Sequence, residues 1–246
     1  MGMAIEGGAT SFPPAYPHLP IEPIGDDLFM ARGSIQMRSI LLLSRNMAIV
    51  RSGGELSLIN PIRLSESGLR DLDALGRVTH ILRLGGAHGS DDPFYVDRYK
   101  ASFWCQEGGT RYRAPAIDHV LTEGGALVFG GARLVNFRAA SFPECAPVLT
   151  AGKGVLLTCD AVQTYADFSN SNLLARLLLP FLGFTKTTLI GPIWLKAATP
   201  AGGSLRGDFE RLLTLPFDAL LAAHGTFLKT GAHTAVERAF AKAFPG

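Results

Sequence analysis

Ligand-type side chains gather in one short stretch, Val78–Pro93, with the sequence VTHILRLGGAHGSDDP. An apolar run of β type ends there at two consecutive glycines, and His88, Asp91 and Asp92 follow before a proline that can open a helix. A strand holds such a loop in position, and glycines let a ligand or metal ion approach the backbone. We therefore expect this loop to carry a functional site.

Two further candidates follow predicted strands later in the chain: Asp160 in LLTCDAV and His224 in LLAAHG. A catalytic zinc ion needs three protein ligands and an open position for water, and His88, Asp160 and His224 supply that number. Mixed nitrogen and oxygen ligands also suit iron or manganese. Asp91 or Asp92 is then predicted to be a fourth ligand, to orient the water or to serve as the base.

No other motif for catalysis or cofactor binding competes with this one. The three cysteines, Cys105, Cys145 and Cys159, are odd in number and lack C-x-x-C spacing, so we interpret them as buried free thiols. The sequence has no G-x-G-x-x-G motif opening a helix, no Walker loop and no G-x-S-x-G elbow. A nucleotide-binding loop and a serine hydrolase are therefore unsupported.

The composition indicates a globular protein and gives no sign of a nucleic-acid or membrane partner. Hydrophobic residues make up 47% and charged residues 18% of the 246 residues, which is typical of a globular chain with a large core. The 23 basic and 21 acidic residues are scattered, so nucleic acid is not an expected partner. The longest apolar runs are too short to span a bilayer, so no membrane partner is expected. The first residues lack the features of a secretory signal, which predicts a cytoplasmic protein.

The elements that position the candidates begin after an extended N-terminal arm, residues 1–20, and we assign residues 21–246 to a single domain. Short β-type runs come first and predict an antiparallel meander. Ser65 is expected to cap a helix that ends at Gly76. The expected strands of the meander are Leu28–Ala31, Ser39–Leu43, Met47–Arg51 and Glu55–Ile59.

The order of strands followed by helices then repeats. After the central loop we expect a short helix capped by Asp92, and at the end of the chain a helix capped by Thr230. Pro180 is expected to break the helix Leu173–Leu182. The remaining expected strands are Ala101–Cys105, Ala126–Phe129, Ala132–Phe137, Pro147–Thr150, Val155–Thr158 and Phe217–Ala222, and a further helix is expected at Leu205–Leu215.

This order predicts an α/β fold, a four-layer αββα sandwich of two mixed β-sheets flanked by helices. It resembles the metallo-β-lactamase fold superfamily from Ile21 to the C-terminus. That superfamily places a His-rich motif after an early strand, an Asp after a middle strand and a His before Gly after a late strand. GVLLTCDAV and ALLAAHGT resemble the later two, and Gly54–Pro61 resembles the G-x-L-x-L-x-x-P run of a less studied branch.

The departures from the superfamily pattern concern its histidines. The motif H-x-H-x-D-H is not reproduced, whether His88 is placed at the first His, at the second His or at the Asp. No His occurs between His119 and His224, where the family has its middle His, although Glu144 and Cys145 lie there as substitute ligands. A standard two-metal site therefore cannot be built.

The resemblance implies a divergent hydrolase-like protein with a reduced, mononuclear site. One divalent ion, zinc, iron or manganese, would be held by His88, Asp160 and His224 and would activate water for attack on an ester, thioester, lactone or phosphoester of a small-molecule substrate. The alternative, supported by the missing histidines, is a non-catalytic protein that has lost the metal and binds a small molecule or a protein partner on the same scaffold.

A separate prediction concerns the apolar segment Leu173–Phe184. Its density of leucine and phenylalanine exceeds what one face of a helix can bury. We expect part of it to cover the edge of the site or to form a homodimer contact.

Overall fold

The first of two sheets is built mainly from the N-terminal half of the chain. The computed structural model describes residues 12–37, 40–108 and 112–245. The first four strands of this sheet are antiparallel neighbours, and the last three join in parallel. In order they are β1 (Glu22–Gly25), β2 (Leu28–Met37), β3 (Leu41–Ser52), β4 (Glu55–Ile59), β5 (Arg77–Leu82), β6 (Ser102–Cys105) and β7 (His119–Val120).

The second sheet contains four strands from the C-terminal half. Its order is β13 (Ala219–Ala222), β10 (Val155–Thr158), β9 (Cys145–Leu149) and β8 (Ala132–Asn136). The pair β10 and β13 is parallel, while β9 pairs antiparallel with both β10 and β8. A separate antiparallel pair is formed by β11 (Val162–Thr164) and β12 (Thr188–Ile190). Both main sheets are therefore mixed, as expected.

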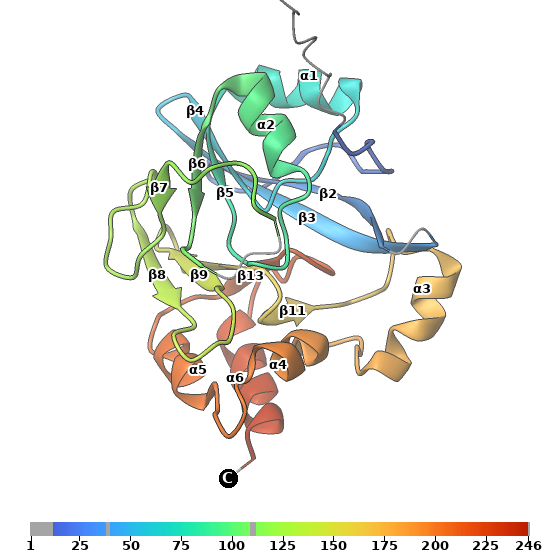
Figure 1. The fold of residues 1–246 in the computed structure, drawn as a ribbon, viewed down its shortest axis with the longest axis vertical. Helices are drawn as coiled ribbons and strands as arrows, with labels where there is room; N and C mark the ends of the chain where they lie inside the picture. The colour runs from blue at the N-terminus through green and yellow to red at the C-terminus, as the bar shows by residue number, and fades with distance from the viewer. Residues whose placement is uncertain (1–11, 38–39, 109–111, 246) are drawn as a thin grey trace, which may run out of the picture.

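Helices cover the outer face of each sheet (Figure 1). The first sheet carries α1 (Glu66–Leu75) and α2 (Asp92–Tyr99), and the second carries α4 (Pro192–Ala198), α5 (Arg206–Leu213) and α6 (Ala232–Ala243). At one side of the molecule α3 (Leu173–Leu178) projects, followed by the 3-10 turn η1 (Pro180–Leu182). The predicted four-layer αββα sandwich is confirmed.

The long strand β3 shows how the layers are held together. Its side chains alternate, so Met47 and Ile49 pack among the residues of α1 and α2, while Ala48 and Val50 pack against the second sheet. Successive side chains of a strand point to opposite faces, and here both faces are buried. A third apolar cluster fills the space between the second sheet and the helices α4, α5 and α6.

Several predicted helix ends agree with the structure. Ser65 accepts a hydrogen bond from the Gly68 amide at 3.3 Å and caps α1, and Gly76 ends that helix. Pro180 separates α3 from η1, as a residue without an amide proton should. Two caps were predicted wrongly by one residue, because Asp91 rather than Asp92 precedes α2 and Gly231 rather than Thr230 precedes α6.

Two strand predictions were wrong. The predicted run Ser39–Leu43 begins outside the described residues, and its part Leu41–Leu43 belongs to one strand with Met47–Arg51. The polar residues between them are paired within the fold: Ser44 with Ser171, and Asn46 with the Ala222 carbonyl of the second sheet. The run Ala126–Phe129 is irregular and ends in a bend rather than forming a strand. Of the predicted N-terminal arm, residues 1–11 lie outside the described ranges, and His18 pairs with Gly33 of β2.

Candidate metal centre

Asp160 and His224 leave the second sheet side by side. In the parallel pair β10 and β13, Thr158 lies opposite Ala222, and each candidate follows its strand by two residues. Because parallel strands end at the same edge of a sheet, both side chains emerge at one place. The strand register alone therefore brings an acid and an imidazole together.

His88 reaches the same place from the loop after β5. The loop crosses the second sheet closely, since Gly85 bridges Glu144 and the Cys145 amide donates to the Leu84 carbonyl at 2.8 Å. A Cβ atom on Gly85 would lie only 2.6 Å from the sulfur of Cys159. This contact requires a glycine, and it brings the loop close enough for His88 to face Asp160.

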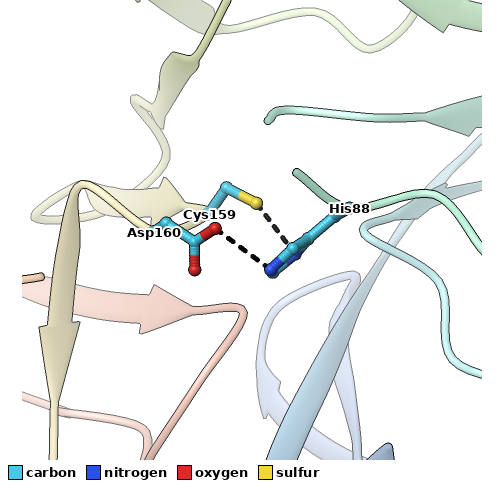
Figure 2. Close-up of side chains that lie close together, drawn as sticks. All are labelled: His88, Cys159 and Asp160. Atoms are coloured by element: carbon cyan, nitrogen blue, oxygen red, sulfur yellow. Dashed lines mark hydrogen bonds and ion pairs between the residues drawn. The ribbon is translucent and has the colours of Figure 1, made fainter. Parts of the chain in front are cut away.

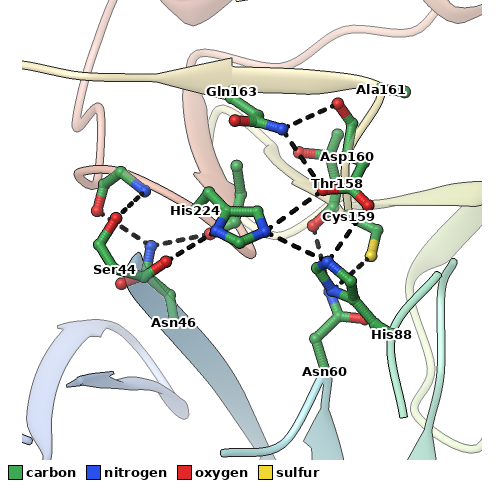
Figure 3. Close-up of polar contacts among 12 residues, drawn as sticks. Ser44, Asn46, Asn60, His88, Thr158, Cys159, Asp160, Ala161, Gln163 and His224 are labelled. Atoms are coloured by element: carbon green, nitrogen blue, oxygen red, sulfur yellow. Dashed lines mark hydrogen bonds and ion pairs between the residues drawn. The ribbon is translucent and has the colours of Figure 1, made fainter. Parts of the chain in front are cut away.

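Donor atoms of three residues converge at this point (Figure 3). His88 Nε2 lies 3.1 Å from Asp160 Oδ2, and His224 Nε2 lies 3.3 Å from Asp160 Oδ1. The two Nε2 atoms are 3.2 Å apart. Ligands bonded to zinc at about 2.0–2.1 Å in a tetrahedral arrangement are themselves about 3.3 Å apart. The spacing of the two nitrogens, and of each nitrogen from one oxygen of Asp160, therefore fits the ligand shell of one such ion.

Backbone contacts set the orientation of His224. Its Nδ1 lies 2.7 Å from the Ser44 carbonyl oxygen. A carbonyl can only accept, so Nδ1 carries a proton, and the tautomer with this single proton presents a bare Nε2 to the cluster. Metal-binding histidines in proteins are oriented in this way, with the second ring nitrogen donating to a carbonyl or carboxylate.

Cys159 lies next to Asp160 and faces His88 (Figure 2), with its sulfur 2.9 Å from His88 Nδ1. One potential ligand atom from each of His88, Cys159 and Asp160 lies within 4.8 Å of the others. Burial, and then the charge of Asp160, raise the pKa of the Cys159 thiol well above its usual range. The predicted burial of Cys159 is confirmed, but its place beside His88 was missed.

The electrostatics favour a neutral imidazole beside an ionised acid. Burial, followed by the nearby charge of Arg45, lowers the pKa of His88 to about 4. Burial opposes ionisation of Asp160, but the contacts with His88 and His224 outweigh it and hold the pKa of this carboxyl well below its usual range. Metal ions bind these forms, because the donor lone pairs are free of protons.

Sequence comparisons found no matching family model and no matching curated protein. Solved structures share the fold: the metallo-β-lactamase DIM-1 exposed to ceftazidime superposes with a TM-score of 0.61 at 11% identity, over 94% of this chain and 100% of that chain. The chain has the metallo-β-lactamase fold. The metallo-β-lactamase FIM-1 from Pseudomonas aeruginosa in its mono-zinc form gives a TM-score of 0.60 at 10% identity, over 94% of this chain and 98% of that chain.

A second kind of protein shares the metallo-β-lactamase fold with this chain. A mutant flavo di-iron protein from Thermotoga maritima gives a TM-score of 0.62 at 15% identity. The match covers 93% of this chain and 63% of the longer flavo di-iron chain. At such low identities these similarities establish the fold, and the chemistry must be argued from the residues of this chain.

On this metallo-β-lactamase fold, the predicted catalytic acids Asp91 and Asp92 form hydrogen bonds with Arg63 and Arg83. Asp92 Oδ2 accepts from Arg83 Nε at 2.6 Å, and both side chains are buried. Asp91 Oδ2 accepts from the backbone amide of Arg63 at 2.9 Å. Within the described ranges, neither carboxylate hydrogen bonds with His88, Asp160 or His224. The structure thus brings together three of the five predicted site residues.

Glu144 holds the backbone at Asp160 by hydrogen bonds rather than acting as a ligand. Its Oε1 accepts hydrogen bonds from the amides of Asp160 at 2.8 Å and Ala161 at 2.5 Å. Burial, and then the charge of Asp160, raise the pKa of Glu144 well above its usual range. The side chain positions the turn that carries Asp160, in the segment where the sequence suggested a substitute ligand.

Two asparagines, Asn46 within β3 and Asn60 directly after β4, join the first sheet to the strand ends that carry the ligands (Figure 3). Asn46 Nδ2 donates to the Ala222 and Gly225 carbonyls, which flank His224. Asn60 Nδ2 donates to the Thr158 carbonyl at 3.1 Å, while its Oδ1 accepts from the Leu84 amide. Sequence reasoning missed both, although a polar residue within or directly after an apolar strand was a usable signal.

Proposed function

We propose that this protein is a metal-dependent hydrolase with one divalent ion held by His88, Asp160 and His224. The observation that carries the proposal is the convergence of two imidazole nitrogens and one carboxylate: the two Nε2 atoms lie 3.2 Å apart, and each lies 3.1 or 3.3 Å from one oxygen of Asp160. When bound, the ion would supply Lewis-acid polarisation and activation of water for hydrolysis of an ester, thioester, lactone or phosphoester.

Each of the three ligands is held in position for such an ion by a neighbouring residue. Asp160 supplies the negative charge, and Glu144 holds the turn in which it lies. His224 presents Nε2 because Ser44 binds its other nitrogen. His88 can present Nε2 when its Nδ1 proton faces the sulfur of Cys159. Ligands prepared in this way need little rearrangement on binding, which favours affinity.

The comparisons support this proposal at the level of the fold. One neighbour is described in a mono-zinc form and another as a di-iron protein. Two imidazoles and a carboxylate suit zinc, iron and manganese. We assign no proton transfer to Asp91 or Asp92, because each carboxylate is occupied by Arg63 or Arg83.

The second candidate function is a non-catalytic binding protein on the same scaffold. It is favoured by the hydrogen bonds that His88, Asp160 and His224 can form with one another, since a satisfied polar network does not require an ion. The two functions differ in one measurable property, the metal content of the purified protein.

Elemental analysis of the chain tests the proposal. The wild type, purified and then supplemented with zinc, iron or manganese, should retain close to one ion per chain. His224→Ala should retain almost none, because among the described residues no other His contacts the cluster and a three-ligand site cannot spare one. His233→Ala is the matched control, since His233 binds the Leu213 carbonyl away from the site, and it should retain the ion. A wild type that binds none of the three metals would establish the binding-protein alternative.

A further inference from the structure

The segment of α3 and η1 exposes an unusual amount of apolar surface. Phe181 is 89% exposed, Leu173 74% and Leu177 59%. Six of the twelve large apolar side chains that the described residues expose lie within these ten positions. We call them the α3 surface: Leu173, Leu174, Leu177, Leu178, Phe181 and Leu182. Apolar side chains gathered so densely mark an interaction site.

The α3 surface is held in place and projects from the body of the molecule (Figure 1). Asn172 caps α3 by accepting from the Ala175 amide, and its own amide group donates to the Ile40 carbonyl. Leu179 and Phe184 point inward and pack with Tyr165. Since the inward side chains already anchor the segment, the outward leucines and Phe181 are not needed for its packing.

Basic residues outnumber acidic ones beside the α3 surface. Between Asp167 and Asp208 the sequence contains no acidic residue and four basic ones. Two of these, Arg176 and Lys186, line an open concavity beside Pro180. Asp167 lies in the same concavity, but it is paired with Arg32 at 3.1 Å. An apolar projection flanked by cations is complementary to a surface with apolar chains beneath anionic headgroups.

We propose that the α3 surface docks onto an anionic lipid bilayer. Its leucines and Phe181 would enter the acyl boundary, while Arg176 and Lys186 would contact headgroup phosphates. A second copy of the chain fits less well, because in a two-fold interface the cations would face one another. The inference is independent of the proposed function and replaces the expectation of no membrane partner, which rested on spanning length alone.

The contact with the bilayer that we propose is peripheral and lies close to the candidate site. No helix in the described ranges has the length and apolarity that a bilayer crossing requires. The surface also connects to the candidate site, since Ser171, just before α3, accepts from the Ser44 amide at 3.1 Å, and the Ser44 carbonyl binds His224. Docking through α3 would therefore hold the candidate site close to the lipid surface.

Vesicle flotation with the full chain tests this proposal. The wild type should float with vesicles containing phosphatidylglycerol and bind vesicles of phosphatidylcholine alone much more weakly. Leu177→Glu combined with Phe181→Glu should abolish flotation, and its circular dichroism should be unchanged because both side chains are exposed. The control is Ile117→Glu, which changes an exposed apolar residue just before β7 and should float like the wild type. The strand β7 lies on the opposite side of the molecule from α3 (Figure 1).

A second variant separates charge from apolar insertion. Arg176→Gln combined with Lys186→Gln should weaken binding to phosphatidylglycerol vesicles by about 30-fold, the effect of two basic residues near a charged surface. Absence of flotation by the wild type, or equal flotation by the double glutamate variant, would overturn the proposal. A wild-type dimer in light scattering that the double glutamate variant converts to a monomer, without flotation of either, would overturn it in favour of a second copy.

Discussion

Asp160 and His224 leave adjacent parallel strands at the same level, whereas His88 reaches them from a loop that contains none of the other ligands of the superfamily motif. We call Asp160 and His224 the strand half of the site, and His88 with its loop the loop half. In the strand half, the register of β10 and β13 places the two side chains next to each other. In the loop half, the close contact of Gly85 with Cys159 and the buried pair of Arg83 and Asp92 hold the backbone. Register preserves ligand positions, while a loop must be held by contacts of its own.

Removal of Arg83 should have the largest effect on stability. Its guanidinium binds Asp92 and the carbonyls of Tyr112 and Ala114, and the side chain is only 2% exposed. Arg83→Ala would leave the Asp92 carboxylate buried without its partner, at a cost of about 3–5 kcal/mol. Urea denaturation would measure the loss.

The matched control for Arg83 is an exposed ion pair. Arg98 and Asp73 lie 3.6 Å apart, and both are well exposed. Arg98→Ala should cost at most about 1 kcal/mol. Equal losses in the two variants would show that the buried pair does not hold the loop half.

Acidification should lower the stability of the folded protein, because it favours protonation of His88 in the loop half of the site. The pKa of His88 is about 4 in the folded protein, because of burial and then the charge of Arg45, against about 6.5 in the unfolded chain. The unfolded chain therefore binds more protons between these values, so stability falls as the pH drops from about 6.5 to about 4. A pKa difference of this size corresponds to about 3 kcal/mol.

The variant His88→Asn isolates this pH dependence, since Asn does not titrate. Urea denaturation in a chelating buffer, between pH 7 and pH 4, should show the stability of wild type falling relative to that of the variant. Chelation keeps metal binding out of the measurement. Parallel pH curves for the two proteins would contradict the assignment of His88 as a buried neutral imidazole.

A methyl group at Gly85 should have a smaller effect. The added Cβ would lie 2.6 Å from the sulfur and 2.9 Å from the Cβ of Cys159, so the loop must shift. Gly85→Ala should cost about 1–3 kcal/mol, the usual range for overpacking, and lower the melting temperature.

Gly207→Ala is the control for this substitution. Gly207 lies in α5, where a Cβ meets no atom within 4 Å, and alanine should stabilise the helix by about 0.5–1 kcal/mol. If Gly85→Ala is equally well tolerated, close packing against Cys159 does not position His88.

The polar residues show where sequence reasoning reached its limit for the fold. Apolar periodicity predicted most strands and helices, because burial of one face or both leaves a local pattern. Ser44 and Asn46 lie between two of the predicted strands, yet they are inside β3 because Ser171 and the second sheet supply their hydrogen-bond partners. Such partners come from residues more than one hundred positions away, and no local pattern contains them.

For the candidate site, the sequence by itself determined which strand ends carry ligand-type side chains: His88, Asp160 and His224. Tertiary structure decided which acids remain available, since Arg83 binds Asp92 and the Arg63 amide binds Asp91. It also decided the supporting residues, Glu144 and Cys159 among them. The physical reason is that residue type fixes what a side chain can donate or accept, while packing between distant segments fixes which partner it meets.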